Sequence, residues 1–167
     1  MSEWNIAELI WSSVVLGIGA TFVMDCWAWF LQRYFAVKSL NYALVGRWLL
    51  CAMQGDFKAT PIVHRKVQKF EVAIGWSVHY VIGIVLAMLF FFSFSQTGLH
   101  SPQLLPALLF GVISVALPFF IMQPALGLGV AANKTLQPNL MRLKSLMAHT
   151  SFGVGLYISA QCLVWLN

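Results

Sequence analysis

The chain has 167 residues, of which 60% are hydrophobic and 9% are charged, and its formal net charge is +5. A soluble domain needs about a quarter of its residues charged to cover its surface against water. The composition therefore excludes an ordinary soluble protein and predicts an integral membrane protein. The apolar residues also gather in blocks of about 20, the length that a helix needs to cross a bilayer.

Four such blocks occur, and each predicts one membrane-spanning helix. Their approximate bounds are residues 6–32, 73–95, 104–122 and 145–166. The first helix is expected to be retained. A cleaved signal peptide begins with a basic region, whereas this N-terminal stretch carries Glu3 and Glu8 and no Lys or Arg. The predicted fold class is all-α: a four-transmembrane-helix bundle that forms a single membrane domain over residues 1–167.

The distribution of Lys and Arg predicts the orientation of this bundle. Seven of these residues lie between the first two spans and three lie between the last two, which accounts for all ten in the chain. Basic connections remain in the cytoplasm, so both termini and the loop 96–103 are expected on the outside. The positive charge is explained by topology, and no nucleic-acid partner is expected.

The long cytoplasmic connection, residues 33–72, contains an apolar stretch at 42–53, YALVGRWLLCAM. Because this stretch is about half the length of a span, it predicts a short interfacial or re-entrant helix. Asn41 is expected to cap its beginning and Gly55 to follow its end. Arg47 and Trp48 are predicted to lie at the cytoplasmic interface.

The stretch that follows, KATPIVHRKVQKFE at residues 58–71, is basic and polar. Two interpretations are open for it. It lies against anionic lipid headgroups, or it is a solvated loop that obeys the orientation rule.

The second and fourth spans share a pattern in which a small residue, a histidine and a glycine follow one another at four-residue spacing. The two sets are Gly75, His79, Gly83 and Ser145, His149, Gly153. The first and third spans both carry a methionine followed by a polar residue, Asp25 in one and Gln123 in the other. These matches predict two similar two-helix repeats in parallel orientation.

Small residues at such spacing allow helix backbones to approach closely in a membrane. The residues predicted to serve this helix packing are Gly17, Thr21, Gly75, Gly83 and Gly153.

Each span also carries one polar residue at a similar depth, and these are Asp25, His79, Gln123 and His149. If the four faces point inward, the side chains meet in the cytoplasmic third of the bundle. An ionised Asp in a span costs about 2.5 to 3.5 kcal/mol, so Asp25 needs a partner, and a histidine is the expected one.

Three interpretations of this intramembrane polar cluster remain open. The groups satisfy one another and fix the helix register; they form a pathway for protons or a small solute; or His79 and His149 bind a metal ion or a haem. The cofactor is unknown on these grounds.

No catalytic motif accompanies the cluster. Gly127 and Gly129 match neither a Walker nor a dinucleotide pattern, and the serines lack the spacing of a hydrolase. An enzyme is therefore not the favoured prediction.

The segments GIGATFVMD, LNYALVGRW, LPALLFGVISVALPFFIMQPALGLGVAANKT and RLKSLMAHTSFGVGLY resemble a bacterial membrane family known as domain of unknown function 2938. The resemblance implies a protein of the bacterial inner membrane and implies no activity. The leading functional prediction is a small membrane transport or binding protein, and the alternative is an accessory subunit. Its expected partners are the lipid bilayer and, beyond that, another copy of itself or a larger membrane complex.

Overall fold

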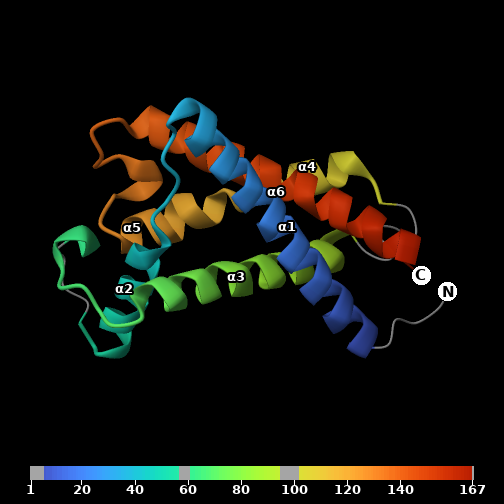
Figure 1. Ribbon diagram of the computed structural model, residues 1–167, viewed down its shortest axis with the longest axis horizontal. Coiled ribbons are helices and arrows are strands. Elements are labelled where there is room, and N and C mark those ends of the chain that lie inside the picture. Colours follow the sequence, from blue (N-terminus) through green and yellow to red (C-terminus); the bar gives the residue numbers. More distant parts are fainter. Residues whose placement is uncertain (1–5, 57–60, 95–101, 167) are drawn as a thin grey trace. The chain divides into compact units, whose positions relative to one another are not determined.

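The computed structural model describes residues 6–56, 61–94 and 102–166. Every regular element in these ranges is a helix, as predicted for an all-α protein (Figure 1). The predicted end of the second span at Ser95, most of the loop 96–103 and the basic residue Lys58 lie outside the described residues.

The elements follow one another along the chain with short connections. They are α1 (Ile6–Phe35), α2 (Tyr42–Met53), the 3-10 turn η1 (Ile62–His64), α3 (Glu71–Phe94), α4 (Leu104–Ser114), the π-helical turn η2 (Pro118–Met122), α5 (Gln123–Ala125), the 3-10 turn η3 (Val130–Ala132) and α6 (Pro138–Leu166).

Three helical segments are long and apolar enough to cross a membrane, and they contain the first three predicted spans within the described residues. They are Ile6–Phe35, Glu71–Ser93 and Leu104–Ala125. α6 is 29 residues long and covers the fourth predicted span, but polar residues such as His149 and Gln161 make it less apolar. Its crossing of the membrane stays a prediction.

α2 occupies the residues that the sequence assigns to the short helix. The side chain of Asn41 accepts a hydrogen bond from the Ala43 N–H at 3.0 Å, which caps the first turn. Gly55 follows the helix with a φ of +73°, a conformation that a side chain disfavours. The location of α2 at the membrane interface stays a prediction.

The chain forms two compact units. The first consists of Met1–Lys38, Tyr80–Ser114 and Ala148–Asn167, and the second of Ser39–His79 and Val115–Met147. α3 and α6 contribute residues to both units, which are described separately below.

In the first unit, glycines set the helix contacts. α1 approaches α3 so closely that a Cβ atom added at Gly17 would lie 2.8 Å from the Gly83 carbonyl oxygen and would also clash with the backbone of Ile84. At Gly83, an added Cβ would clash with the hydroxyl of Thr21. The glycines therefore let the two backbones come into contact. Such close van der Waals packing is a main source of attraction between helices in lipid.

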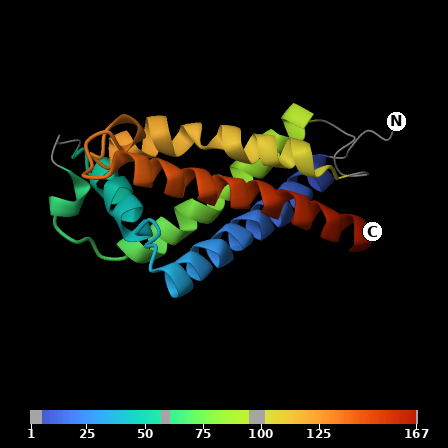
Figure 2. The same cartoon turned by 90° about the horizontal axis from the view of Figure 1, so that it is seen from above.

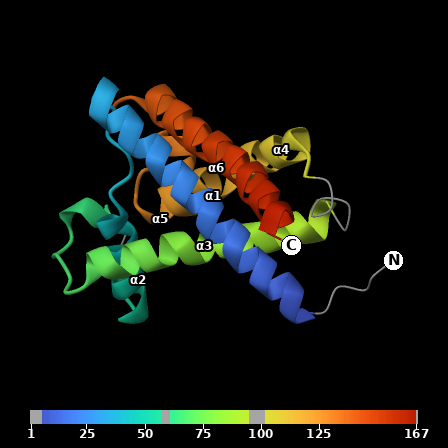
Figure 3. The same cartoon turned by 45° about the vertical axis from the view of Figure 1, so that its right-hand side comes forward.

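α6 makes two further contacts of this kind in the first unit. It runs beside α4, where a Cβ at Gly153 would lie 2.7 Å from the Ala107 carbonyl oxygen (Figure 2). It also lies beside α1, where a Cβ at Gly155 would lie 2.7 Å from Cα of Ala20 (Figure 3). Phe152 and Leu156, which flank the two glycines in α6, are buried.

The third predicted span is interrupted. After α4 the chain forms η2, in which the Gln123 N–H bonds to the Pro118 carbonyl five residues earlier. Pro118 lacks an N–H and cannot continue the α-helical bonding pattern, so a wider π turn accommodates the break. The turn directly precedes Gln123, one of the predicted intramembrane polar residues.

The second unit is built around α2, η1 and α5. Its apolar core consists of Val45, Cys51, Ile62 and Leu126. The Ile62 N–H bonds to the Leu126 carbonyl at 3.3 Å and joins η1 to the end of α5. This core holds the basic connection after α2 against the apolar helices.

The close glycine contacts lead to a prediction for stability. Gly153→Leu places a large side chain where α4 and α6 backbones meet, so we expect a loss of about 3 kcal/mol in the free energy of unfolding. Ala73→Leu adds a similar volume at an exposed position of α3 and should change stability by less than about 0.5 kcal/mol. Unfolding in mixed detergent measures both, and equal losses would contradict the assigned contact.

Candidate functional site

The four predicted intramembrane polar residues divide between the two units. Asp25 and His149 belong to the first unit, and His79 and Gln123 belong to the second. The local surroundings of each residue are therefore described within its own unit.

Asp25 lies on α1 and accepts a hydrogen bond from the Tyr80 hydroxyl of α3 at 3.0 Å. Asp25 is about two turns from Gly17 on α1, and Tyr80 is less than one turn from Gly83 on α3, so the close crossing of the two helices brings these side chains within reach. The sequence analysis named a histidine as the partner of Asp25 and did not consider Tyr80. Tyr80 directly follows His79, and neighbouring residues of a helix point in different directions, so the spacing pattern did not indicate it.

His149 lies on α6, and its Nδ1 is 2.7 Å from the Ser114 Oγ of α4. Ser114 also donates its single hydroxyl hydrogen to the Gly111 carbonyl, at 2.7 Å. Both contacts are satisfied together only if Nδ1 carries a hydrogen and donates to Ser114. In the neutral ring the lone pair then belongs to Nε2, so this nitrogen is the one that accepts a proton.

Gln123 is 2% exposed and follows the π turn η2. Its Nε2 donates to the Ser145 hydroxyl of α6 at 3.1 Å. Its Oε1 is buried and has no hydrogen-bond partner in the part of the chain that the structure describes. A buried carbonyl oxygen without a donor costs about 1 to 3 kcal/mol.

His79 lies on α3 against the beginning of α2. Its ring stacks on Tyr42 with a centroid distance of 4.1 Å and meets Trp76 edge to face at 5.8 Å. Tyr42 and Trp76 also contact each other, at 4.7 Å. These three rings join α2 to α3, an arrangement that the sequence analysis did not foresee.

Metal binding was one interpretation of the two histidines. Among the described residues, no three side chains of His, Cys, Asp and Glu lie close enough together to hold a metal ion. The metal or haem interpretation of His79 and His149 stays a prediction.

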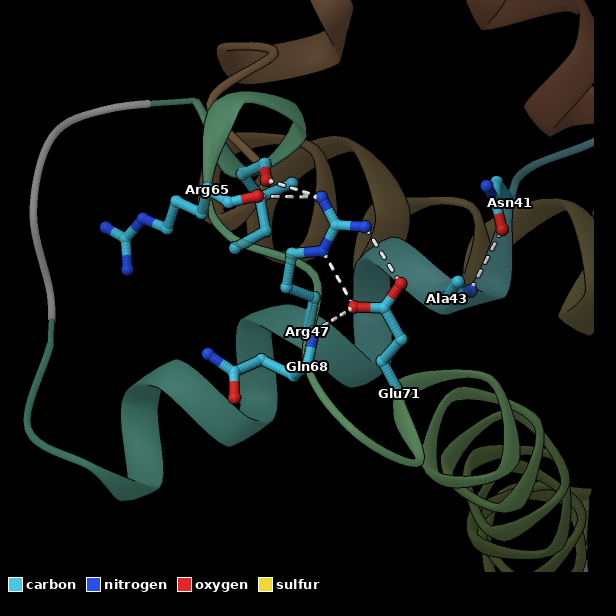
Figure 4. Close-up of polar contacts among 7 residues, drawn as sticks. Asn41, Ala43, Arg47, Arg65, Gln68 and Glu71 are labelled. Carbon is cyan, nitrogen blue, oxygen red and sulfur yellow. Dashed lines mark hydrogen bonds and ion pairs between the residues drawn. The ribbon is translucent and has the colours of Figure 1, made fainter.

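A buried ion pair dominates the second unit, and the sequence analysis missed it. Arg47 of α2 forms two parallel hydrogen bonds to the Glu71 carboxylate of α3, each 2.8 Å long (Figure 4). Arg47 is 8% exposed and Glu71 is 6% exposed. Such a bidentate pair is stronger and more directional than a single charge contact.

Close backbone packing allows this pair to form. α2 crosses the start of α3 at Gly46 and Gly75, where a side chain would clash with the carbonyl of Glu71 or of Tyr42. The hydrogen bonds to Glu71 raise the pKa of Arg47 above its usual value, so the guanidinium remains charged. The pair is thus a permanent link between the two helices.

The same two side chains also hold the backbone between them. Arg47 Nη1 donates to the carbonyls of Ile62, at 3.4 Å, and Arg65, at 3.1 Å. The Gln68 N–H donates to Glu71 Oε2 at 2.8 Å (Figure 4). The ion pair therefore fixes the path of residues 62–71, called the anchored segment below.

The sequence contained a signal for this pair. Residues 33–72 hold seven basic residues and only two acidic ones, Asp56 and Glu71. An arginine in the middle of an apolar helix needs an acidic partner when buried. Arg65 takes the other acid, with Nη1 3.5 Å from Asp56 Oδ2.

Comparison with known families adds one result. The sequence profile described as "Protein of unknown function (DUF2938)" matches residues 14–163. The chain belongs to the DUF2938 family. No curated protein and no solved structure matches it. For this DUF2938 member, function must be argued from the groups described above.

The ion pair leads to a second prediction. Arg47→Met leaves the Glu71 carboxylate buried without its partner, so we expect a loss of about 3 to 5 kcal/mol in unfolding free energy. Arg47→Lys keeps the charge but not the two parallel hydrogen bonds, so its loss in unfolding free energy should lie between zero and that of Arg47→Met. Removing both charges, as in Arg47→Met with Glu71→Leu, should restore part of the loss.

The matched control is Lys66→Met, which removes a basic side chain from an exposed position of the anchored segment and should change stability by less than about 0.5 kcal/mol. Detergent unfolding of the wild type, Arg47→Met, Glu71→Leu and the double variant gives the coupling energy of the pair. A coupling energy near zero would show that the pair does not stabilise the fold.

Proposed function

We propose that this DUF2938 protein provides a polar route for protons or a small polar solute across the bacterial inner membrane. The supporting observation is the buried Oε1 of Gln123, which has no donor among the described residues. In an apolar surrounding this atom requires a hydrogen-bond donor, which water or a polar solute can supply. π turns such as η2 frequently accompany functional sites in helices.

The titratable groups of the first unit support the same proposal. The neutral imidazole of His149 can accept a proton at Nε2. Asp25 carries a carboxylate within α1, where ionisable residues mark proton and ion pathways. A route needs groups that can gain and release a proton, and both residues have this chemistry.

The alternative is a structural or accessory subunit of a larger membrane complex. One observation favours it: Asp25 with Tyr80, and His149 with Ser114, each link two helices of the first unit. Hydrogen bonds between helices stabilise membrane bundles by about 0.6 kcal/mol each. Under this alternative the polar groups serve stability and carry nothing.

Proton flux distinguishes the two functions. In liposomes with an entrapped pH dye and a valinomycin-driven potential, wild-type protein should give flux above that of protein-free liposomes. His149→Gln and Asp25→Asn should lower the flux by about tenfold or more, because each removes a proton-accepting group. His64→Gln, at an exposed position of η1, is the matched control and should leave the flux unchanged.

Wild-type flux equal to that of protein-free liposomes would reject a proton route. If the variants then also lower the thermal midpoint, the structural alternative is favoured. Gln123→Leu tests the polar-solute form of the proposal separately. If Gln123 Oε1 is unsatisfied in the absence of solute, this substitution should raise the free energy of unfolding measured without solute.

The proposed topology places four spans in the membrane and both termini on the periplasmic side. It is supported by the ten basic residues, all of which lie between the first and second or the third and fourth predicted spans. Alkaline phosphatase fused after residue 167 should be active, whereas the same reporter fused after Gly55 should be inactive. Cytoplasmic fluorescence from a fluorescent protein fused after residue 167 would show that α6 does not cross.

A further inference from the structure

The anchored segment, residues 62–71, has a period of three. Ile62 and Glu71 are buried, Arg65 and Gln68 are half-buried, and the two residues between each of these positions are exposed. The same four residues make the hydrogen bonds with Arg47 and Glu71 described above. One edge of the segment is thus held inward by the ion pair, and its other side faces outward.

The outward face has a defined composition. Its members are Val63, His64, Lys66, Val67, Lys69 and Phe70. Val63, Val67 and Phe70 are 57%, 67% and 65% exposed. Three large apolar side chains therefore alternate with two lysines and a histidine on one surface, which is unusual for a loop in water.

The charge on this face is not neutralised within the described chain. Both acidic residues of the connection are used by Arg47 and Arg65, and neither Lys66 nor Lys69 forms an ion pair with the residues that the structure describes. Lys69 instead places its Nζ 4.9 Å from the centre of the Phe70 ring. After Glu71 the sequence contains no further acidic residue.

The conformation of the segment is held in place. Phe70 has a φ of +67°, which costs a non-glycine residue about 1 kcal/mol or more. Its carbonyl accepts the Ile74 N–H at 3.0 Å in the first turn of α3. The strained residue turns the chain so that Glu71 points to Arg47 while the Phe70 side chain is exposed.

We propose that the outward face binds the anionic phospholipid surface of the membrane. Lys66 and Lys69 contact phosphate and headgroup charges, and Val63, Val67 and Phe70 enter the boundary with the acyl chains. Charge complementarity supports this partner, because basic residues beside spans are attracted to anionic lipids by about 1 kcal/mol each. Exposed apolar side chains beside them are the second component of interfacial binding. A solvated loop would need the charges but not the apolar residues.

The test measures lipid binding to the full-length protein. Native mass spectrometry of detergent-purified protein, titrated with dioleoylphosphatidylglycerol or dioleoylphosphatidylcholine, gives the affinity for each lipid. For Lys66→Gln with Lys69→Gln, we expect the affinity for phosphatidylglycerol to fall about fivefold for each lysine removed, with little change for phosphatidylcholine. Val67→Asn should weaken the binding of both lipids, since it removes an apolar contact and no charge.

The matched control removes two other basic residues of the second unit, with Lys134→Gln and Lys144→Gln. It should leave phosphatidylglycerol binding at more than half of the wild-type affinity. Equal losses in the control and the Lys66 and Lys69 variant, or no loss in the latter, would overturn the proposal. A thermal midpoint close to wild type is expected for the Lys66 and Lys69 variant, because neither lysine forms an ion pair with the residues that the structure describes. Free glycerol phosphate is the competitor that tests for a soluble ligand. If it displaces phosphatidylglycerol from the protein as well as an equal concentration of the lipid does, the ligand is a soluble anion and the proposal is overturned.

This surface is independent of the polar route. Loss of lipid binding in the Lys66 and Lys69 variant with unchanged proton flux supports the lipid surface alone. Normal lipid binding in the His149→Gln protein is expected whether or not the route exists.

Discussion

A polar group in an apolar medium must find its hydrogen-bond partner within the protein, because lipid offers none. The described chain satisfies its backbone through helices and satisfies several hydroxyls through the same helices. Thr21 donates to the Gly17 carbonyl, and Ser151 donates to the Ala148 carbonyl, each at 2.7 Å. Asp25 and His149 find partners on neighbouring helices. Against this background, the buried Oε1 of Gln123 has no hydrogen-bond partner among the described residues.

The Arg47–Glu71 pair applies the same constraint to a buried charge. Each partner makes a further bond to the backbone of the anchored segment, so one interaction links α2, α3 and the connection between them. The desolvation of such a pair is costly, and its bonds must be well formed to offset that cost. The outward face of the segment depends on it, because the inward bonds decide which side chains remain exposed.

Glycines control how closely the helices approach, and this in turn decides which polar groups can meet. α1 and α3 meet closely at Gly17 and Gly83, and the same two helices are joined by the Asp25–Tyr80 hydrogen bond. α4 and α6 meet closely at Gly111 and Gly153, and the same two helices are joined by the Ser114–His149 hydrogen bond. Each two-helix pair therefore combines a close crossing with a polar link. The two polar links use different residue types, and the predicted two-helix repeat stays a prediction.

The sequence by itself determined the helical class, the apolar segments and the range of α2, because these depend on hydropathy and on local capping by residues such as Asn41. It also identified four polar residues of the helices, Asp25, His79, Gln123 and His149, whose place within the membrane stays a prediction. The hydrogen-bond and ion-pair partners of these residues were not determined in this way. Tyr80 and Ser114 could be assigned only by the tertiary structure, since contacts between helices depend on rotation and crossing geometry that a spacing pattern does not specify. For Arg47 the sequence left two acidic candidates, Asp56 and Glu71, and the structure decided between them. The three-residue period of residues 62–71 likewise arises from packing, because no local propensity requires it.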